Sequence, residues 1–455
     1  MDMWLKRKEY ETALNNILRQ YQFRAQEWQT EKAVCVIKGL AGSGKTSFVL
    51  EHFKDKKVFY FSFAGLSEES AEKFFAERVS AKTGVAVCGW EDSLKAVSKR
   101  FKIVLLDNLA SVSSYKRFRK AFYDHMIPNI NLRSFIVLIT QPTDDISGLT
   151  DKYATLNMDY LTVSDVVKLF PKLPKVDILG LCAISGGIPK ILYEHDGLKS
   201  FEDNLRDMLN PSSAFCTFMP ELLARYFRKP ESYHYILCAI ANGNHHVSAI
   251  GKFTGFAYNK CDNYLAGLID CGFVKTEKII SKRGTEKTVY KLTNSYFRLW
   301  YLYIYSNRTE LQLGNEVVVD GIIQSIINKE IHTFHLQKAF EYANKQIHGY
   351  DMWTSFGIRD RVAYAPQTVS KGRFSYTFDA IVRNDNKAVF IKVLEKPQDS
   401  CDRGELETLR KAVSLMNTYY DSCVFIFAKR RFSEYAAKEA SSDDVIRLVG
   451  VERLG

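Results

Sequence analysis

The chain has 455 residues, of which 46% are hydrophobic and 25% charged, a balance typical of globular proteins; its length predicts roughly two to four domains. No segment approaches the roughly 18 uninterrupted apolar residues of a membrane span, and no apolar core of a secretory signal follows the charged N-terminal stretch. We therefore expect a cytoplasmic protein without a membrane partner. The net charge of +11 permits an acidic partner such as nucleotide or nucleic acid but does not establish one.

Cysteine and histidine usage argues against a zinc site. The nine cysteines form no CxxC pair and several lie in apolar runs, so we interpret them as reduced, mostly buried side chains. No cysteine or acidic cluster accompanies the histidine pairs His245–His246 and His332/His335. A structural metal is therefore not expected there.

Residues 1–170 are predicted to form an α/β domain around a parallel sheet. Short apolar runs alternate with amphipathic, helix-like stretches, and the runs lack strict polar alternation, as strands covered on both faces do. The runs lie at 33–39, 58–64, 102–108, 134–141 and 154–162.

A glycine-rich loop joins the first of these runs to a helix-like stretch. Its G-x-x-x-x-G-K-T spacing predicts backbone N–H groups that turn toward phosphates, with the partial positive charge of the helix N-terminus beside them. The lysine is expected to reach the β- and γ-phosphates, and the threonine hydroxyl to ligate Mg²⁺. We therefore expect a nucleoside triphosphate, ATP, to bind here with Mg²⁺. The residues assigned to this site are Gly39, Gly42, Gly44, Lys45, Thr46 and Ser47.

Two further polar residues end the apolar run at 102–108. Asp107 is the candidate acid that holds Mg²⁺ beside the phosphate loop, with a strand-end cap as the alternative. Asn108 follows, where many ATPases of this pattern have a glutamate. An amide can orient water but cannot accept its proton at neutral pH, so we expect hydrolysis to be slow or to depend on another residue or a partner.

Thr140 and Gln141 end the run at 134–141. The carboxyl ends of parallel strands face the ligand crevice, so Thr140 is a candidate sensor of the γ-phosphate. A plain strand-end hydroxyl is the alternative interpretation.

Three further regions follow the α/β domain. Residues 171–230 are predicted to be a helical lid or linker, interrupted by the Gly-Gly-Ile-Pro stretch at 186–189. Residues 231–305 combine three helices with a hairpin, which predicts a winged helix-turn-helix. Residues 306–455 begin with helices and continue as a second small α/β domain.

The hairpin of the predicted winged helix is rich in basic residues. It is a candidate for contact with nucleic-acid phosphates, whereas the predicted helix at 258–272 has only Lys260 against Asp262 and Asp270. The alternative is that the winged helix is a packing module with a solvated wing. The basic residues are Lys275, Lys278, Lys282, Arg283, Lys287 and Lys291.

With these motifs in order, the chain resembles the archaeal-type P-loop ATPases, which are related to the STAND and AAA+ groups. Lys6 and Glu9 are similar to an Arg-x-x-Glu pair in the first helix of that family. Gly187 and Pro189 match its Gly-x-Pro element, and the resemblance implies that this element couples nucleotide state to the domain that follows.

The resemblance also implies a C-terminal domain with the PD-(D/E)xK nuclease fold. It places Glu341 on an early helix and Asp379 on the expected strand. The next strand should carry Glu-x-Lys but has Lys392 and Leu394 in those places. A lysine puts positive charge where a catalytic cation belongs, so the departure argues against cleavage.

The first hypothesis is an ATP-dependent switch that acts on the winged helix and the degenerate nuclease-like domain. The second is a nucleic-acid-binding protein in which ATP is structural. An active metal-dependent nuclease is disfavoured. An oligomer or a partner protein is compatible with all three.

Overall fold

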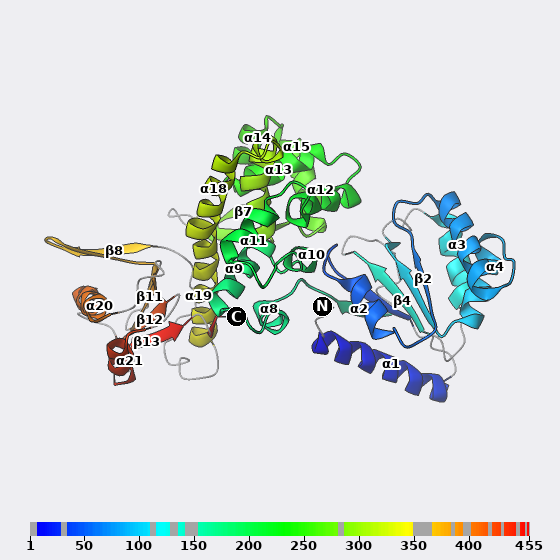
Figure 1. Cartoon of the computed structure of the whole chain (residues 1–455), viewed down its shortest axis with the longest axis horizontal. Coiled ribbons are helices and arrows are strands. Elements are labelled where there is room, and N and C mark those ends of the chain that lie inside the picture. The colour runs from blue at the N-terminus through cyan, green and yellow to red at the C-terminus, as the bar shows by residue number, and fades with distance from the viewer. Residues whose placement is uncertain are drawn as a thin grey trace. The chain divides into compact units, whose positions relative to one another are not determined.

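The computed structural model is drawn in Figure 1. It describes residues 7–28, 34–109, 115–127, 135–141, 153–280, 286–348, 366–383, 387–394, 402–416, 421–428, 432–442, 446–450 and 453–454. The chain divides into two compact units, which we describe separately. The first unit comprises 1–161, 188–194 and 214–305, and the second comprises 162–187, 195–213 and 306–455.

A five-stranded, wholly parallel sheet forms the centre of the first unit, which confirms the predicted α/β class. The strands are β1 (Val34–Lys38), β2 (Val58–Ser62), β3 (Ile103–Asp107), β4 (Phe135–Thr140) and β5 (Ala154–Asn157). Their order is β2-β3-β4-β1-β5. Lys38 pairs with Thr140, and Ser62 with Asp107, so the carboxyl ends of these strands meet at one edge.

Helices cover both faces of this sheet, as the continuous apolar strands require. Val34 and Val36 point into a core formed with α3 (Glu68–Thr83), α4 (Gly89–Arg100), α5 (Lys116–Ala121) and the π-helical turn η2 (Phe122–Met126). Cys35 and Ile37 point the other way, toward α1 (Lys8–Trp28) and α2 (Lys45–His52). Figure 1 shows the two helical layers on either side of the strands.

The rest of the first unit is mainly helical. The predicted order of three helices followed by a hairpin is confirmed, with the hairpin antiparallel and in register from Val274–Leu292 to Ile280–Glu286. The elements are α10 (Pro189–Leu192), α12 (Ala214–Tyr226), α13 (Glu231–Ala241), α14 (Val247–Thr254), α15 (Tyr258–Asp270), β6 (Val274–Ile280), β7 (Glu286–Leu292), α16 (Ser295–Leu299) and η3 (Trp300–Tyr305).

The second unit begins with a group of helices. These are α8 (Val163–Leu169), α9 (Lys175–Ser185), α11 (Phe201–Met208), α17 (Ser306–Gln312), α18 (Glu316–Ser325), η4 (Ile326–Glu330) and α19 (Ile331–His348). Among the described ranges of both units, no helix is long and apolar enough to cross a membrane.

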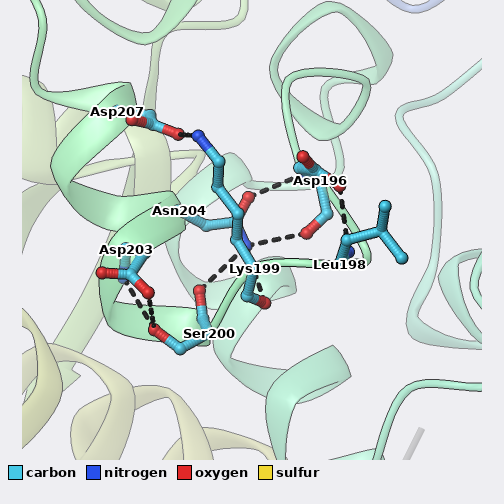
Figure 2. A network of polar contacts seen from close by, with 7 residues as sticks. All are labelled: Asp196, Leu198, Lys199, Ser200, Asp203, Asn204 and Asp207. Atoms are coloured by element: carbon cyan, nitrogen blue, oxygen red, sulfur yellow. Dashed lines mark hydrogen bonds and ion pairs between the residues drawn. The ribbon is translucent and has the colours of Figure 1, made fainter.

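A buried amide orders the loop before α11 (Figure 2). Nδ2 of Asn204 donates to the carbonyl oxygens of Asp196 and Ser200, both at 2.9 Å, and its Oδ1 accepts from the Asp196 N–H at 2.7 Å. Ser200 caps α11 by accepting from the N–H of Asp203. The network fixes the segment through which the chain re-enters the second unit after residue 194.

A small α/β group ends the second unit. Its sheet has the order β10-β11-β12-β13, in which only the β10–β11 pair is antiparallel. The chain bends at Asp379, so the stretch 374–383 of this predicted α/β domain forms two strands, β9 and β10. The elements are β8 (Gln367–Lys371), β9 (Phe374–Phe378), β10 (Ala380–Arg383), β11 (Lys387–Leu394), α20 (Arg403–Met416), β12 (Asp421–Ala428), α21 (Glu434–Ser441) and β13 (Ile446–Gly450).

Candidate functional site

The glycine-rich loop lies between β1 and α2 and has the backbone that the spacing predicts. Gly42 and Gly44 have φ of 82° and 86°, in the left-handed region that favours glycine. A Cβ on Gly39 would lie 2.1 Å from the carbonyl oxygen of Met158. Gly44 is the N-cap of α2 and provides no side-chain cap, so the amides at the start of this helix are left for another acceptor.

Lys45 folds back over this loop. Its Nζ donates to the carbonyl oxygens of Gly39 at 2.6 Å and Leu40 at 2.8 Å, and the side chain is 8% exposed. The ammonium group is therefore already within the loop, where phosphate oxygens could replace these carbonyls as acceptors.

Ser43 is a loop residue that the sequence reasoning missed. Its Oγ is buried and has no hydrogen-bond partner within the described structure. An unsatisfied buried hydroxyl costs about 1–3 kcal/mol, and a ligand with acceptor oxygens would remove that cost. Ser47, which the sequence assigned to the site, is exposed on the first turn of α2.

The two candidate Mg²⁺ ligands are in direct contact. Thr46 Oγ1, in the first turn of α2, donates to Asp107 Oδ2 at the end of β3, at 2.7 Å, although β4 lies between β3 and the strand β1 that leads into the loop. The Tyr60 hydroxyl also donates to Oδ2, at 3.0 Å. Burial and the negative charge of Asp107 raise the pKa of Tyr60 to about 12, so this phenol stays a neutral donor. Tyr60 was not predicted; its only signal is a hydroxyl-bearing side chain in the strand beside β3.

Asn108 is held in place by two hydrogen bonds. Its N–H donates to Asp107 Oδ1 at 2.7 Å, and its Nδ2 donates to the Ser62 hydroxyl at 2.9 Å. Its φ of 57° is positive, which asparagine tolerates better than most residues with a Cβ. The amide is thus directed toward β2 at the edge where Asp107 lies.

Thr140 ends β4 at that same edge and is 1% exposed, with Gln141 beside it at 6%. Its place between the strands of Lys38 and Asp107 suits the predicted γ-phosphate sensor. That role stays a prediction.

Pro189 also lies near the loop. It is the first residue of α10, and its Cγ is 3.8 Å from where a Cβ on Gly44 would be. Gly187 of the predicted Gly-x-Pro element belongs to the second unit, whereas Pro189 belongs to the first.

Arg7, which immediately precedes α1, contacts the loop and was not singled out from the sequence. Its Nη1 donates to the Ser43 carbonyl oxygen at 3.4 Å, and its guanidinium lies 4.3 Å from the centre of the Tyr10 ring. Of the two residues that the family resemblance placed in the first helix, Glu9 is exposed on α1 and Lys6 lies outside the described residues.

The predicted wing presents its basic residues on both faces of the β6–β7 hairpin. Lys287 pairs with Ile279, whereas Lys278 pairs with Thr288, so these two exposed lysines lie on opposite faces. Lys275 and Lys291 both form ion pairs with Glu277, at 3.1 and 2.6 Å. Lys282 and Arg283 lie outside the described residues.

The residues that the family resemblance assigned to a nuclease-like domain have structural partners. Asp379 is buried, and its Oδ2 accepts from the Val393 N–H at 2.7 Å. Lys392 Nζ donates to the Thr377 carbonyl oxygen, and Glu341 pairs with Lys338 one helical turn away. In the part of the chain that the structure describes, no three His, Cys, Asp or Glu side chains form a group that could hold a metal ion.

Comparison with known proteins finds distant likenesses. No family model matches the chain. An uncharacterized protein of Methanocaldococcus jannaschii is 23% identical over 331 residues, 69% of this chain and 71% of its own length.

Two solved structures illustrate the structural likeness. A Walker-type ATPase of Pyrococcus abyssi covers 66% of this chain and 96% of its own, with 15% identity and a TM-score of 0.47. The Aeropyrum pernix ORC1 protein, solved in complex with DNA, covers 71% of this chain and 93% of its own, with 14% identity and a TM-score of 0.36. At these values the residues of the site, rather than the likenesses, carry the functional inference.

Proposed function

We propose that this chain is a P-loop ATPase that binds ATP with Mg²⁺ at Gly39–Thr46 and Asp107 and turns it over slowly. The contact between Thr46 Oγ1 and Asp107 Oδ2, 2.7 Å long, carries the proposal. It brings a hydroxyl and a carboxylate together beside a loop that presents backbone amides and the Lys45 ammonium group. This combination suits a triphosphate and its cation.

Each residue has a distinct part in this proposal. The loop amides and Lys45 hold the phosphates, and the buried Ser43 hydroxyl gains an acceptor from them. Thr46 and Asp107 hold Mg²⁺, which when bound neutralises charge on the β- and γ-phosphates. Tyr60 positions the Asp107 carboxylate from the side of β2.

Asn108 is the reason to expect slow turnover. Its amide can orient a water molecule but cannot take its proton, and its Nδ2 is already donated to Ser62. Slow hydrolysis suits a switch, in which the bound nucleotide sets the arrangement of the helices after residue 188. The direct contacts of α10 and α12 with the loop support this coupling.

The test is steady-state ATP turnover and nucleotide binding with Mg²⁺ for the wild type and Lys45→Ala. Lys54→Ala is the matched control, because Lys54 is 60% exposed and pairs only with Glu51 among the described residues. We expect Lys45→Ala alone to lose binding and turnover. Equal binding by Lys45→Ala and the wild type would refute the site.

A second candidate function is nucleic-acid binding through the first unit. The exposed Lys278 and Lys287 support it, as do two aromatic side chains on α14 and α15, Phe253 at 49% and Tyr258 at 63% exposure. Single-stranded DNA can stack on such rings while lysines contact its phosphates. Adding duplex or single-stranded DNA to the turnover assay tests this function. Affinity that falls steeply with salt, and weakens in Lys287→Glu, would support it.

A further inference from the structure

The phosphate loop is covered by a helix far from it in sequence. The N–H of Ala41 donates to the hydroxyl oxygen of Tyr226, the last residue of α12, at 3.2 Å and across 185 positions. The carbonyl of the same residue, Ala41, accepts from the Tyr160 hydroxyl at 3.1 Å. Both backbone groups of one loop residue are therefore bound by phenols.

Aromatic packing strengthens this cover. The Phe218 ring, also on α12 and 2% exposed, lies so close to Gly42 that a Cβ there would be 2.5 Å from its Cζ. Lys190 of α10 lies 5.5 Å from the centre of the Phe218 ring and forms a 2.8 Å ion pair with Glu221. This face of α12 is thus seated on the loop through both polar and apolar contacts.

The same helix contacts the start of the β6–β7 hairpin. The Tyr226 ring packs edge-on against Phe273 with 5.3 Å between centroids. Leu40 of the loop packs against Gly272, with its Cδ2 3.1 Å from where a Cβ would be. A shift of the Tyr226 side chain would therefore change its contact with Phe273, the residue before β6.

We propose that Tyr226 is a gate on the phosphate loop, an inference that rests on the proposed ATP site. Its hydroxyl oxygen accepts the N–H of Ala41 in the loop, and nucleotide binding exchanges that oxygen for a phosphate oxygen. The exchange releases the polar contact of α12 with the loop. Tyr226 is a positioning residue, since it acts through the backbone of Ala41.

The direction of the effect follows from competition for one donor. Tyr226→Phe keeps the ring against Phe273 but leaves the Ala41 N–H without its acceptor in the free chain, which raises the free energy of that state only. Nucleotide affinity should therefore rise, by about fivefold for one neutral hydrogen bond. By thermodynamic linkage, bound nucleotide should weaken the contact of α12 with the loop by the same free energy.

Tyr160→Phe is the matched control. This substitution also removes one phenolic hydroxyl that contacts Ala41, but that hydroxyl donates to the carbonyl oxygen. A carbonyl oxygen is an acceptor and cannot donate a hydrogen bond to a phosphate. Burial raises the pKa of Tyr160 well above its usual value, so in the wild type this hydroxyl remains a donor to that carbonyl. Its loss should not tighten nucleotide binding.

The experiment measures the Kd of Mg·ADP and of a non-hydrolysable Mg·ATP analogue for the wild type, Tyr226→Phe and Tyr160→Phe. Hydrogen exchange of residues 214–226, with and without nucleotide, gives a readout that a purely structural tyrosine would not change. We expect tighter binding in Tyr226→Phe alone and faster exchange of α12 when the wild type binds nucleotide.

Each outcome decides between the proposals. Equal nucleotide affinity of the wild type and Tyr226→Phe overturns the gate and leaves the ATP site intact. The same conclusion follows if both phenylalanine variants bind nucleotide more tightly by the same factor, or if nucleotide leaves the hydrogen exchange of α12 unchanged. Binding by Tyr226→Phe but not by the wild type supports a strong gate. If neither binds nucleotide, both proposals fail.

Discussion

The Thr46 hydroxyl donates to the Asp107 carboxylate across 61 positions of the chain, from the first turn of α2 to the end of β3. The sheet order explains the contact. β4 lies between β1 and β3, and all three strands end at one edge, so α2, which follows the loop after β1, begins beside the end of β3. The proposed pairing of Thr46 with Asp107 as Mg²⁺ ligands therefore depends on the order of the strands.

Asn108→Asp should raise ATP turnover by about tenfold or more, because a positioned carboxylate that accepts a proton contributes about 10²–10⁴-fold in enzymes. Aspartate suits this position better than glutamate, since φ at Asn108 is 57° and a short polar side chain tolerates that backbone. The measurement is steady-state turnover with Mg²⁺.

Asn108→Ala is the control for this substitution, since it removes the bond to Ser62 without adding a base. Its turnover should not rise. Turnover by Asn108→Asp that stays at or below the wild-type rate would show that another step limits hydrolysis.

Local patterns were sufficient to predict the parallel strands, the glycine-rich loop between a strand and a helix, and the place of Asp107 at the end of a strand. Each depends on a run of neighbouring residues: an apolar strand, a glycine spacing, a carboxylate where a strand ends. The antiparallel hairpin after α15 was also predicted from the sequence, from two strand-like stretches around a charged turn.

The partners of the loop could not be predicted, because they come from distant segments. Tyr226 and Phe218 belong to α12, where they read as ordinary apolar-face residues. Arg7 reads as one charge among several in a basic N-terminal stretch, and Tyr60 as one of three aromatic residues in β2. Only the fold shows that these side chains meet the loop or Asp107.

Gly42→Ala should destabilise the first unit more than Gly44→Ala. Both glycines have φ above 80°, so an added Cβ costs about 1–2 kcal/mol of backbone strain at either position. At Gly42 the new Cβ would also meet the buried Phe218 ring at 2.5 Å, whereas at Gly44 the nearest atom is 3.8 Å away. Overpacking should add about 1–3 kcal/mol there, measured as a lower midpoint of urea denaturation.

A double-mutant cycle with Phe218→Leu separates the two costs of the glycine substitutions. The shorter side chain should recover part of the loss in Gly42→Ala and none of it in Gly44→Ala. Equal losses in both glycine variants, or no coupling to Phe218, would contradict the seating of α12 on the loop.

Asp379→Ala should lower the stability of the second unit by about 1–3 kcal/mol, because it leaves the buried Val393 N–H without the acceptor that now lies 2.7 Å away. Asp379→Asn retains an oxygen at that place and should cost less. Thermal denaturation of the wild type and both variants, with and without Mg²⁺ or Mn²⁺, measures the difference. A structural aspartate predicts the same order of stability with either metal or none. A catalytic aspartate instead predicts metal-dependent nicking of DNA that both variants lose. That result would support an active nuclease in the C-terminal domain despite Lys392.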